Sequence, residues 1–209
     1  MAWAGLWLIA TFPAAGVDID EYPAVRRWLS SFGRRLYQTG ERLPDGSRAR
    51  KRTQHAWWEL QDSCAYYGEF ERPKVLWPEI SDEAGFALCS QQMFCNNKVY
   101  FLTASSLDDL LFLFAVLSSD VIRWYGRQIT VTTGAGAHSW FKYSVEAFPI
   151  PPRGTAWPAV SVEAREPQGR ETGSPGPTRV LKERNVAVAK LYGLTRPEQA
   201  LLDSLNGPV

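Results

Sequence analysis

Apolar residues recur at helical spacing in two segments of the chain, and this spacing predicts two helices in its first 150 residues. The first segment, residues 22–36, alternates large apolar residues with arginine pairs, and Asp20 and Pro23 suit the start of a helix. We expect this amphipathic helix to pack on a sheet. The second segment, residues 107–125, is apolar on most faces and follows Ser105 and Ser106, either of which can cap it. We expect it to form a central buried helix.

Short apolar runs bounded by turn residues predict the strands. The expected strands are residues 6–11, 73–80 ending at Pro78, 86–89, 99–102 and 142–150. Asn96 and Asn97 indicate a turn between two of these strands, and residues 132–137, TTGAGA, indicate a flexible loop. The pattern predicts an α+β fold, with a mixed twisted sheet and a central apolar helix.

The last third of the chain changes in composition. Residues 151–178 are rich in Pro and Gly, which is typical of a linker. Residues 180–192 and 197–205 have the pattern of two short helices, with Gly193 placed to end the first. We therefore predict a domain over residues 1–150, a linker over 151–178 and a helical C-terminal tail over 179–209.

Net charge and cysteine content narrow the class of protein. The formal net charge is only +1, whereas an autonomous nucleic-acid binder is usually more basic, so contacts to DNA would require local clustering of charge. Three cysteines without C-x-x-C spacing argue against a disulfide framework or a zinc site, so we expect no metal site and a reducing, cytoplasmic compartment. The apolar start of the chain lacks the basic residues of a signal peptide.

No catalytic motif was found in the sequence. An adenine methyltransferase needs a glycine loop after a strand to bind S-adenosylmethionine (AdoMet), and a D/N-P-P-[YFW] tetrapeptide to hold the flipped base. The sequence has neither, and it also lacks G-x-S-x-G, Walker and H-E-x-x-H motifs. We therefore assign no catalytic residue and expect no cofactor in this chain.

The densest positive charge lies in the polar loop of residues 38–54. This loop contains only two acidic residues, Glu41 and Asp45, so its local charge is +5 − 2 = +3. Its five basic residues are Arg42, Arg48, Arg50, Lys51 and Arg52. The loop shows no apolar anchor in the sequence. A solvated surface loop and a phosphate-contacting loop both fit this pattern. The neighbouring aromatic residues Trp57, Trp58, Tyr66 and Tyr67 suit a core better than stacking on bases.

Six segments, taken in order, resemble one family. They are WLIATFPAAGVDIDEYPAVRRWLSSFGRRL, WWELQDSCAYYGEFERPKVLWPEIS, FCNNKVYFLT, LSSDVIRWYGR, FKYSVEAFPIPP and KLYGLTRPEQALLDSL. Together they resemble the TaqI-like C-terminal specificity domain of type IIG restriction–modification enzymes and related phage-resistance methyltransferases. The resemblance covers roughly residues 7–205.

The resemblance implies a DNA target-recognition domain that acts with an AdoMet-dependent, adenine-specific methyltransferase domain, in the same chain or in another one. AdoMet would then bind to that missing catalytic domain. In this reading, double-stranded DNA is the partner and basic or polar side chains contact it. The candidate residues are Arg48, Arg50, Lys51, Arg52, Asn96, Asn97, Lys98, Arg123, Arg127, His138 and Lys142.

Three other interpretations stay open. Type I specificity subunits look similar around the leucine-rich helix, and they imply the same kind of DNA reading. An enzyme with an unfamiliar active site would show a cleft with several titrating carboxylates. A protein-interaction module would show a large apolar patch without a basic rim. Asn96, Asn97 and Lys98 likewise fit either a plain turn or a reader of base edges.

Overall fold

The chain folds into two compact units, which we describe from a computed structural model. The structure describes residues 5–83, 85–152, 154 and 177–206. The N-terminal unit comprises residues 2–69, and the C-terminal unit begins at Phe70. This division falls inside the range 1–150 that the sequence assigns to one domain.

The N-terminal unit is built from short helices and ordered loops. Its elements are η1 (Pro13–Ala15), η2 (Ile19–Glu21), α1 (Pro23–Ser30) and η3 (Gly33–Leu36), and η4 (Tyr67–Glu71) crosses its boundary. The amphipathic helix starts with Pro23 as expected, but Tyr22 is its N-cap and Asp18 caps η2 instead. It ends at Ser30, and none of its residues is buried, so the prediction that it packs on a sheet is wrong.

The expected strand at residues 6–11 is also absent. Leu6 to Ile9 are exposed, and only Thr11 and Phe12 reach the interior. The Thr11 hydroxyl donates to the carbonyl oxygen of Trp58 at 2.8 Å, and the amide of Leu60 donates to the carbonyl of Thr11 at 2.9 Å. The segment is therefore held by two loop contacts, without a sheet partner among the described residues of this unit.

The C-terminal unit contains two small sheets, one of three strands and one of two, among the described residues. Its strands are β1 (Lys74–Pro78), β2 (Ile80–Ser81), β3 (Ala87–Cys89), β4 (Val99–Leu102) and β5 (His138–Ser139). Strand β1 lies between β3 and β4, and β2 pairs with β5. Every pairing in the described residues is antiparallel, so the α+β class is confirmed while the sheet is antiparallel instead of mixed. Strands β3 and β4 flank β1 and do not form a hairpin with each other.

Two helices cover one face of this sheet. They are α2 (Leu107–Leu117) and α3 (Asp120–Ile129), which replace the single helix expected over residues 107–125. Ser106 caps α2, as predicted, and the hydroxyl of Ser119 accepts from the amide of Ile122 to cap α3. Seven of the eleven residues of α2 are buried, in agreement with a central apolar helix. Val75 and Trp77 on alternate positions of β1 face the same core.

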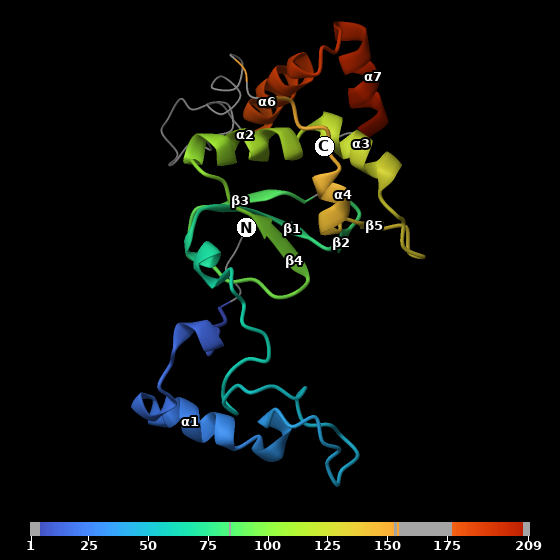
Figure 1. The fold of residues 1–209 in the computed structure, drawn as a ribbon. Coiled ribbons are helices and arrows are strands. Elements are labelled where there is room, and N and C mark those ends of the chain that lie inside the picture. The colour runs from blue at the N-terminus through green and yellow to red at the C-terminus, as the bar shows by residue number, and fades with distance from the viewer. Residues whose placement is uncertain (1–4, 84, 153, 155–176, 207–209) are drawn as a thin grey trace. The chain divides into compact units, whose positions relative to one another are not determined.

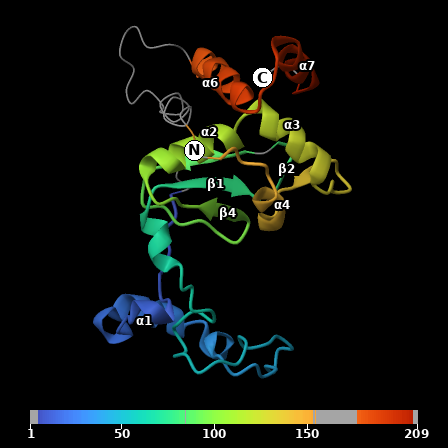
Figure 2. The ribbon, with the colours of Figure 1, turned by 45° about the horizontal axis from the view of Figure 1, so that its top comes forward.

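Helices α6 (Pro177–Leu191) and α7 (Arg196–Asn206) form a further layer against α2 and α3 (Figures 1 and 2). Both were expected from the sequence, and Gly193 ends α6 in a left-handed conformation with φ +71°. Most of the predicted linker, residues 151–178, lies outside the described residues.

A strand predicted over residues 142–150 is wrong. This segment forms the short helix α4 (Lys142–Glu146), followed by a turn in which the amide of Phe148 donates to the carbonyl of Val145 at 3.2 Å. Val145 and Phe148 are the buried apolar residues of the segment, and they are three positions apart. That spacing places both on one face of a helical turn.

Candidate nucleic-acid interface

The basic loop of the N-terminal unit is an ordered hairpin. Backbone hydrogen bonds join Gly40 to Arg50, Glu41 to Ala49 and Leu43 to Ser47, at 2.8, 3.0 and 2.8 Å. Gly46 adopts φ +82°, a conformation that favours glycine, at the tip. The local sequence explains the turn, because Pro-Asp-Gly-Ser is typical turn chemistry.

The turn also fixes a carboxylate. The side chain of Asp45 accepts from the amide and hydroxyl of Ser47 at 3.0 and 2.6 Å, and it pairs with Arg35 at 2.7 Å. Hydrogen bonds from Ser47, and then the Arg35 guanidinium, hold the pKa of Asp45 well below its ordinary value. The carboxylate of Asp45 is therefore ionised, and its contacts with Ser47 and Arg35 stabilise the hairpin.

Two arginines face each other across the hairpin. Arg42 and Arg48 form an antiparallel bridge pair, so their side chains project from the same face. Both are exposed, and neither makes an ion pair with any described residue. Like charges directly opposite each other destabilise a hairpin, and an anion bound between them would remove this cost. Arg42 contributes to the loop's charge but is not among the contact residues predicted from the sequence.

Leu43 and Ala49 anchor the hairpin from inside. Both are buried, so the expectation of a loop without an apolar anchor is wrong. They hold the hairpin in place while Arg42 and Arg48, the bridge pair, remain exposed. The basic face is therefore presented by an anchored hairpin, which suits a binding site better than a freely moving loop does.

Arg50 has a structural role and does not belong to this exposed face. Its guanidinium group donates to the carbonyl oxygens of Leu36 at 2.8 Å and of Trp57 and Glu59, both at 2.7 Å. Burial lowers its pKa. The three carbonyls come from η3 and from the segment after the hairpin. Arg50 thus joins three segments of its unit, and we no longer count it among the DNA contacts.

The remaining basic residues of the loop are exposed. Arg52 donates from Nε to the carbonyl of Thr39 at 3.2 Å, which leaves its other nitrogens open to solvent. The side chain of Lys51 makes no hydrogen bond or ion pair with the described residues, while its amide donates to Gln61 at 2.7 Å. We define the basic hairpin as Arg42, Arg48, Lys51 and Arg52.

The candidate cations of the C-terminal unit are paired with carboxylates. Lys98 lies 3.1 Å from Glu79, and Lys142 lies 3.5 Å from Glu146 on α4. Arg123 and Arg127 on α3 both face Glu83. Their charge is therefore already balanced within the chain, in contrast to the bridge pair Arg42 and Arg48.

The polar candidates are partly used by their own loops. The side chain of Asn96 accepts from the amide of Lys98 at 3.0 Å, which confirms the predicted turn, and Asn97 next to it is exposed. His138 Nδ1 lies 2.9 Å from the hydroxyl of Thr130, which ends α3. Pairing of Ser81 with His138 joins β2 to β5, so His138 lies beside the loop that carries Glu83.

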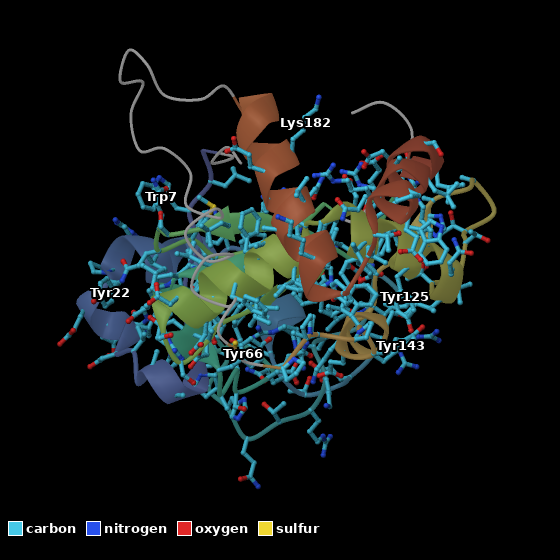
Figure 3. All side chains as sticks on the ribbon, turned by 90° about the horizontal axis from the view of Figure 1, so that it is seen from above. Trp7, Tyr22, Tyr66, Tyr125, Tyr143 and Lys182 are labelled. Carbon is cyan, nitrogen blue, oxygen red and sulfur yellow. The ribbon has the colours of Figure 1, made fainter. Side chains whose placement is uncertain are left out.

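The aromatic residues of the two units differ in how far they are buried. Trp57 and Trp58 are half-buried with an edge-to-face contact, 5.7 Å between ring centroids, which favours packing over base stacking. Tyr143 on α4, which is labelled in Figure 3, is largely exposed. Its ring stacks on that of Phe141, with 5.5 Å between the ring centroids. The described residues contain no group of three or more His, Cys, Asp or Glu side chains that could hold a metal ion. None of the described helices is long and apolar enough to cross a membrane.

Comparison with known proteins identifies the family of the chain. The chain is 28% identical over 202 residues to the type II methyltransferase M.PaeR7I of Pseudomonas aeruginosa. The matched part is 96% of this chain but 32% of the relative, so the chain spans about a third of the relative's length. A model of the TaqI-like C-terminal specificity domain matches residues 43–150, more than half of the chain, from the tip of the basic hairpin to the end of the α4 segment. The protein therefore belongs to the TaqI-like C-terminal specificity domain family.

Proposed function

We propose that this chain reads the sequence of duplex DNA on behalf of an AdoMet-dependent, adenine-specific DNA methyltransferase. The observation that carries the proposal is the bridge pair of Arg42 and Arg48, an anchored pair of like charges with no counter-ion among the described residues. Duplex DNA supplies closely spaced phosphates, which suit such a pair. Membership in a specificity-domain family and the similarity to a methyltransferase support the same function.

The proposed mechanism is orientation of DNA. The basic hairpin holds phosphates without regard to sequence, and polar side chains such as Asn97 and His138 contact base edges. A separate catalytic domain then flips an adenine out of the duplex and methylates it. Such a protein acts on cytoplasmic DNA within a restriction–modification system.

Exchange of the domain tests the role in specificity. This chain should replace the matching third of the P. aeruginosa methyltransferase, and methylated sites should then be mapped on genomic DNA. The proposal predicts that the chimera methylates a different sequence from that of the parent. A chimera that is active at the parent's sequence would show that this chain does not set the specificity.

The proposal also places AdoMet binding outside this chain. Calorimetric titration of the chain with AdoMet should give no binding heat, because the sequence lacks the glycine loop and the catalytic tetrapeptide. Stoichiometric binding would favour the interpretation as an enzyme with an unfamiliar active site.

A further inference from the structure

Arg123 and Arg127 converge on one carboxylate at an exposed edge of the C-terminal unit. Glu83 Oε1 lies 3.4 Å from Nη2 of Arg127, and Glu83 Oε2 lies 3.9 Å from Nε of Arg123. Asp120 also pairs with Arg123, at 3.5 Å. The side chain of Glu83 is 55% exposed, whereas those of Arg123 and Arg127 are 19% and 28% exposed. The side chains of Arg123 and Arg127 are therefore mostly buried, and the carboxylate of Glu83 approaches them from the solvent side.

The fold fixes the two arginines on one face of α3. They are four residues apart, so their side chains lie next to each other. Gly126 lies between them in the sequence and packs on the buried ring of Trp140, where an added Cβ would come within 2.5 Å of the ring. This contact turns Gly126 inward and sets the rotation of α3. Two like charges at this spacing destabilise a helix unless an anion lies between them.

The backbone of the segment that carries Glu83 is held through Ser81, whose hydroxyl also donates to the backbone carbonyl of Glu83. Strand β2 pairs with β5, and the indole of Trp140 donates to the carbonyl of Ser81 at 3.1 Å. Glu83 follows two residues later in a loop and is exposed. An exposed ion pair contributes little free energy, about 0–1 kcal/mol, so a competing anion can displace it.

We propose that Arg123 and Arg127 form a phosphodiester-binding site, and that Glu83 occupies this site until DNA displaces its carboxylate. This inference rests on the proposed function and adds to it a second phosphate contact and its control. One phosphate group takes the place of one carboxylate, between the same guanidinium groups. A random-sequence duplex does not displace the carboxylate, so it makes one phosphate contact fewer and is held less tightly.

The test is the salt dependence of binding of the 209-residue chain to a random-sequence duplex, starting at low ionic strength. Glu83→Gln should bind more tightly than the unchanged chain, because the site is open. Its log–log salt slope should steepen by about 0.9, the value for one added phosphate contact. In the triple variant Glu83→Gln/Arg123→Gln/Arg127→Gln, both gains should disappear.

Asp82→Asn provides the matched control. Asp82 precedes Glu83, is exposed and makes no ion pair with a described residue, so this variant loses the same charge without opening the site. We expect its slope to equal that of the unchanged chain. Equal slopes for Glu83→Gln and Asp82→Asn would overturn the inference, while DNA binding by the unchanged chain would still support the proposed function. Absence of binding in all variants would overturn both.

Discussion

Arg48 and Arg50 lie two positions apart in the basic loop but have different roles. Arg48 is exposed opposite Arg42, whereas Arg50 donates three hydrogen bonds to backbone carbonyls. The sequence predicts the local excess of positive charge but cannot assign these roles. Residues two positions apart on a strand share a face, so the difference comes from the carbonyl groups of η3 and of residues 57–59, which lie within hydrogen-bond distance of Arg50. Local sequence does not contain these contacts. The site was thus predictable as a loop and not as a set of residues.

Replacement of each arginine by alanine should separate the two roles. Arg50→Ala leaves three carbonyls without their donor, and we expect the free energy of unfolding to fall by about 3 kcal/mol. Arg48→Ala should change it by less than about 0.5 kcal/mol and lower the DNA salt slope by about 0.9. Urea denaturation and DNA titration of both variants measure this. If the Arg50→Ala protein kept its free energy of unfolding, the structural role inferred for Arg50 would be contradicted.

Gly126 allows α3 to approach Trp140 closely. In Gly126→Ala, the new methyl group would lie 2.5 Å from a ring that is fully buried and cannot move aside. We expect a loss of about 1–3 kcal/mol in the free energy of unfolding. Gly134→Ala is the control, because an added Cβ there meets nothing within 4 Å. Thermal denaturation should show a lower midpoint for the first variant alone, and equal midpoints would contradict the packing argument.

At the scale of elements, compact apolar runs bounded by turn residues predicted their strands well, and the other patterns did so only in part. Strands β1, β3 and β4 lie within or match the predicted ranges, because each is a compact apolar run bounded by turn residues. Residues 142–150 alternate polar and apolar residues, which predicts a strand, but the same apolar residues fit one face of a helical turn equally well. The long helix breaks at Ser118 and Ser119, whose hydroxyls bond to neighbouring backbone groups.

The junction of α3 with the C-terminal helices buries a carboxyl group. Asn185 donates to the side chain of Asp120, and Asn206 donates to its backbone carbonyl at 3.0 Å. Burial raises the pKa of Asp120 above its ordinary value of 3.8, and the nearby Asp203 acts in the same direction, although Arg123 and Arg184 oppose it. The folded protein therefore holds this proton more tightly than the unfolded chain does.

This raised pKa predicts a pH dependence of stability. A folded-state pKa above the unfolded value means that the stabilisation is present at low pH and is lost as the pH rises through the raised pKa. We expect the free energy of unfolding of the unchanged protein, relative to Asp120→Asn, to fall as the pH rises from 3.8 through the raised pKa. Urea denaturation at several pH values measures the difference. A relative stability that increases over this range would mean that the arginines dominate.

At the scale of the molecule, the sequence predicted the class of fold but not the division of the chain into two compact units. The α+β class follows from the periodicity of the apolar residues, since the strands and helices have different repeats. No Pro- or Gly-rich stretch marks the boundary between Glu69 and Phe70, so a division into two units could not be predicted from composition. Pairing of distant strands, such as β2 with β5, likewise depends on contacts that local patterns do not contain.

The measurement that tests the central claim most directly is the salt dependence of DNA binding by a triple variant of the basic hairpin. Arg42→Ala/Arg48→Ala/Lys51→Ala should be compared with Lys182→Ala/Lys190→Ala/Arg196→Ala. The control removes three exposed cations from α6 and α7, and Lys182 projects outward in Figure 3. If the hairpin binds phosphates, its variant should lose affinity for specific and random duplexes alike, and its log–log slope should flatten by up to about 2.7, while the control keeps its slope. Equal slopes in the two triple variants would contradict the account.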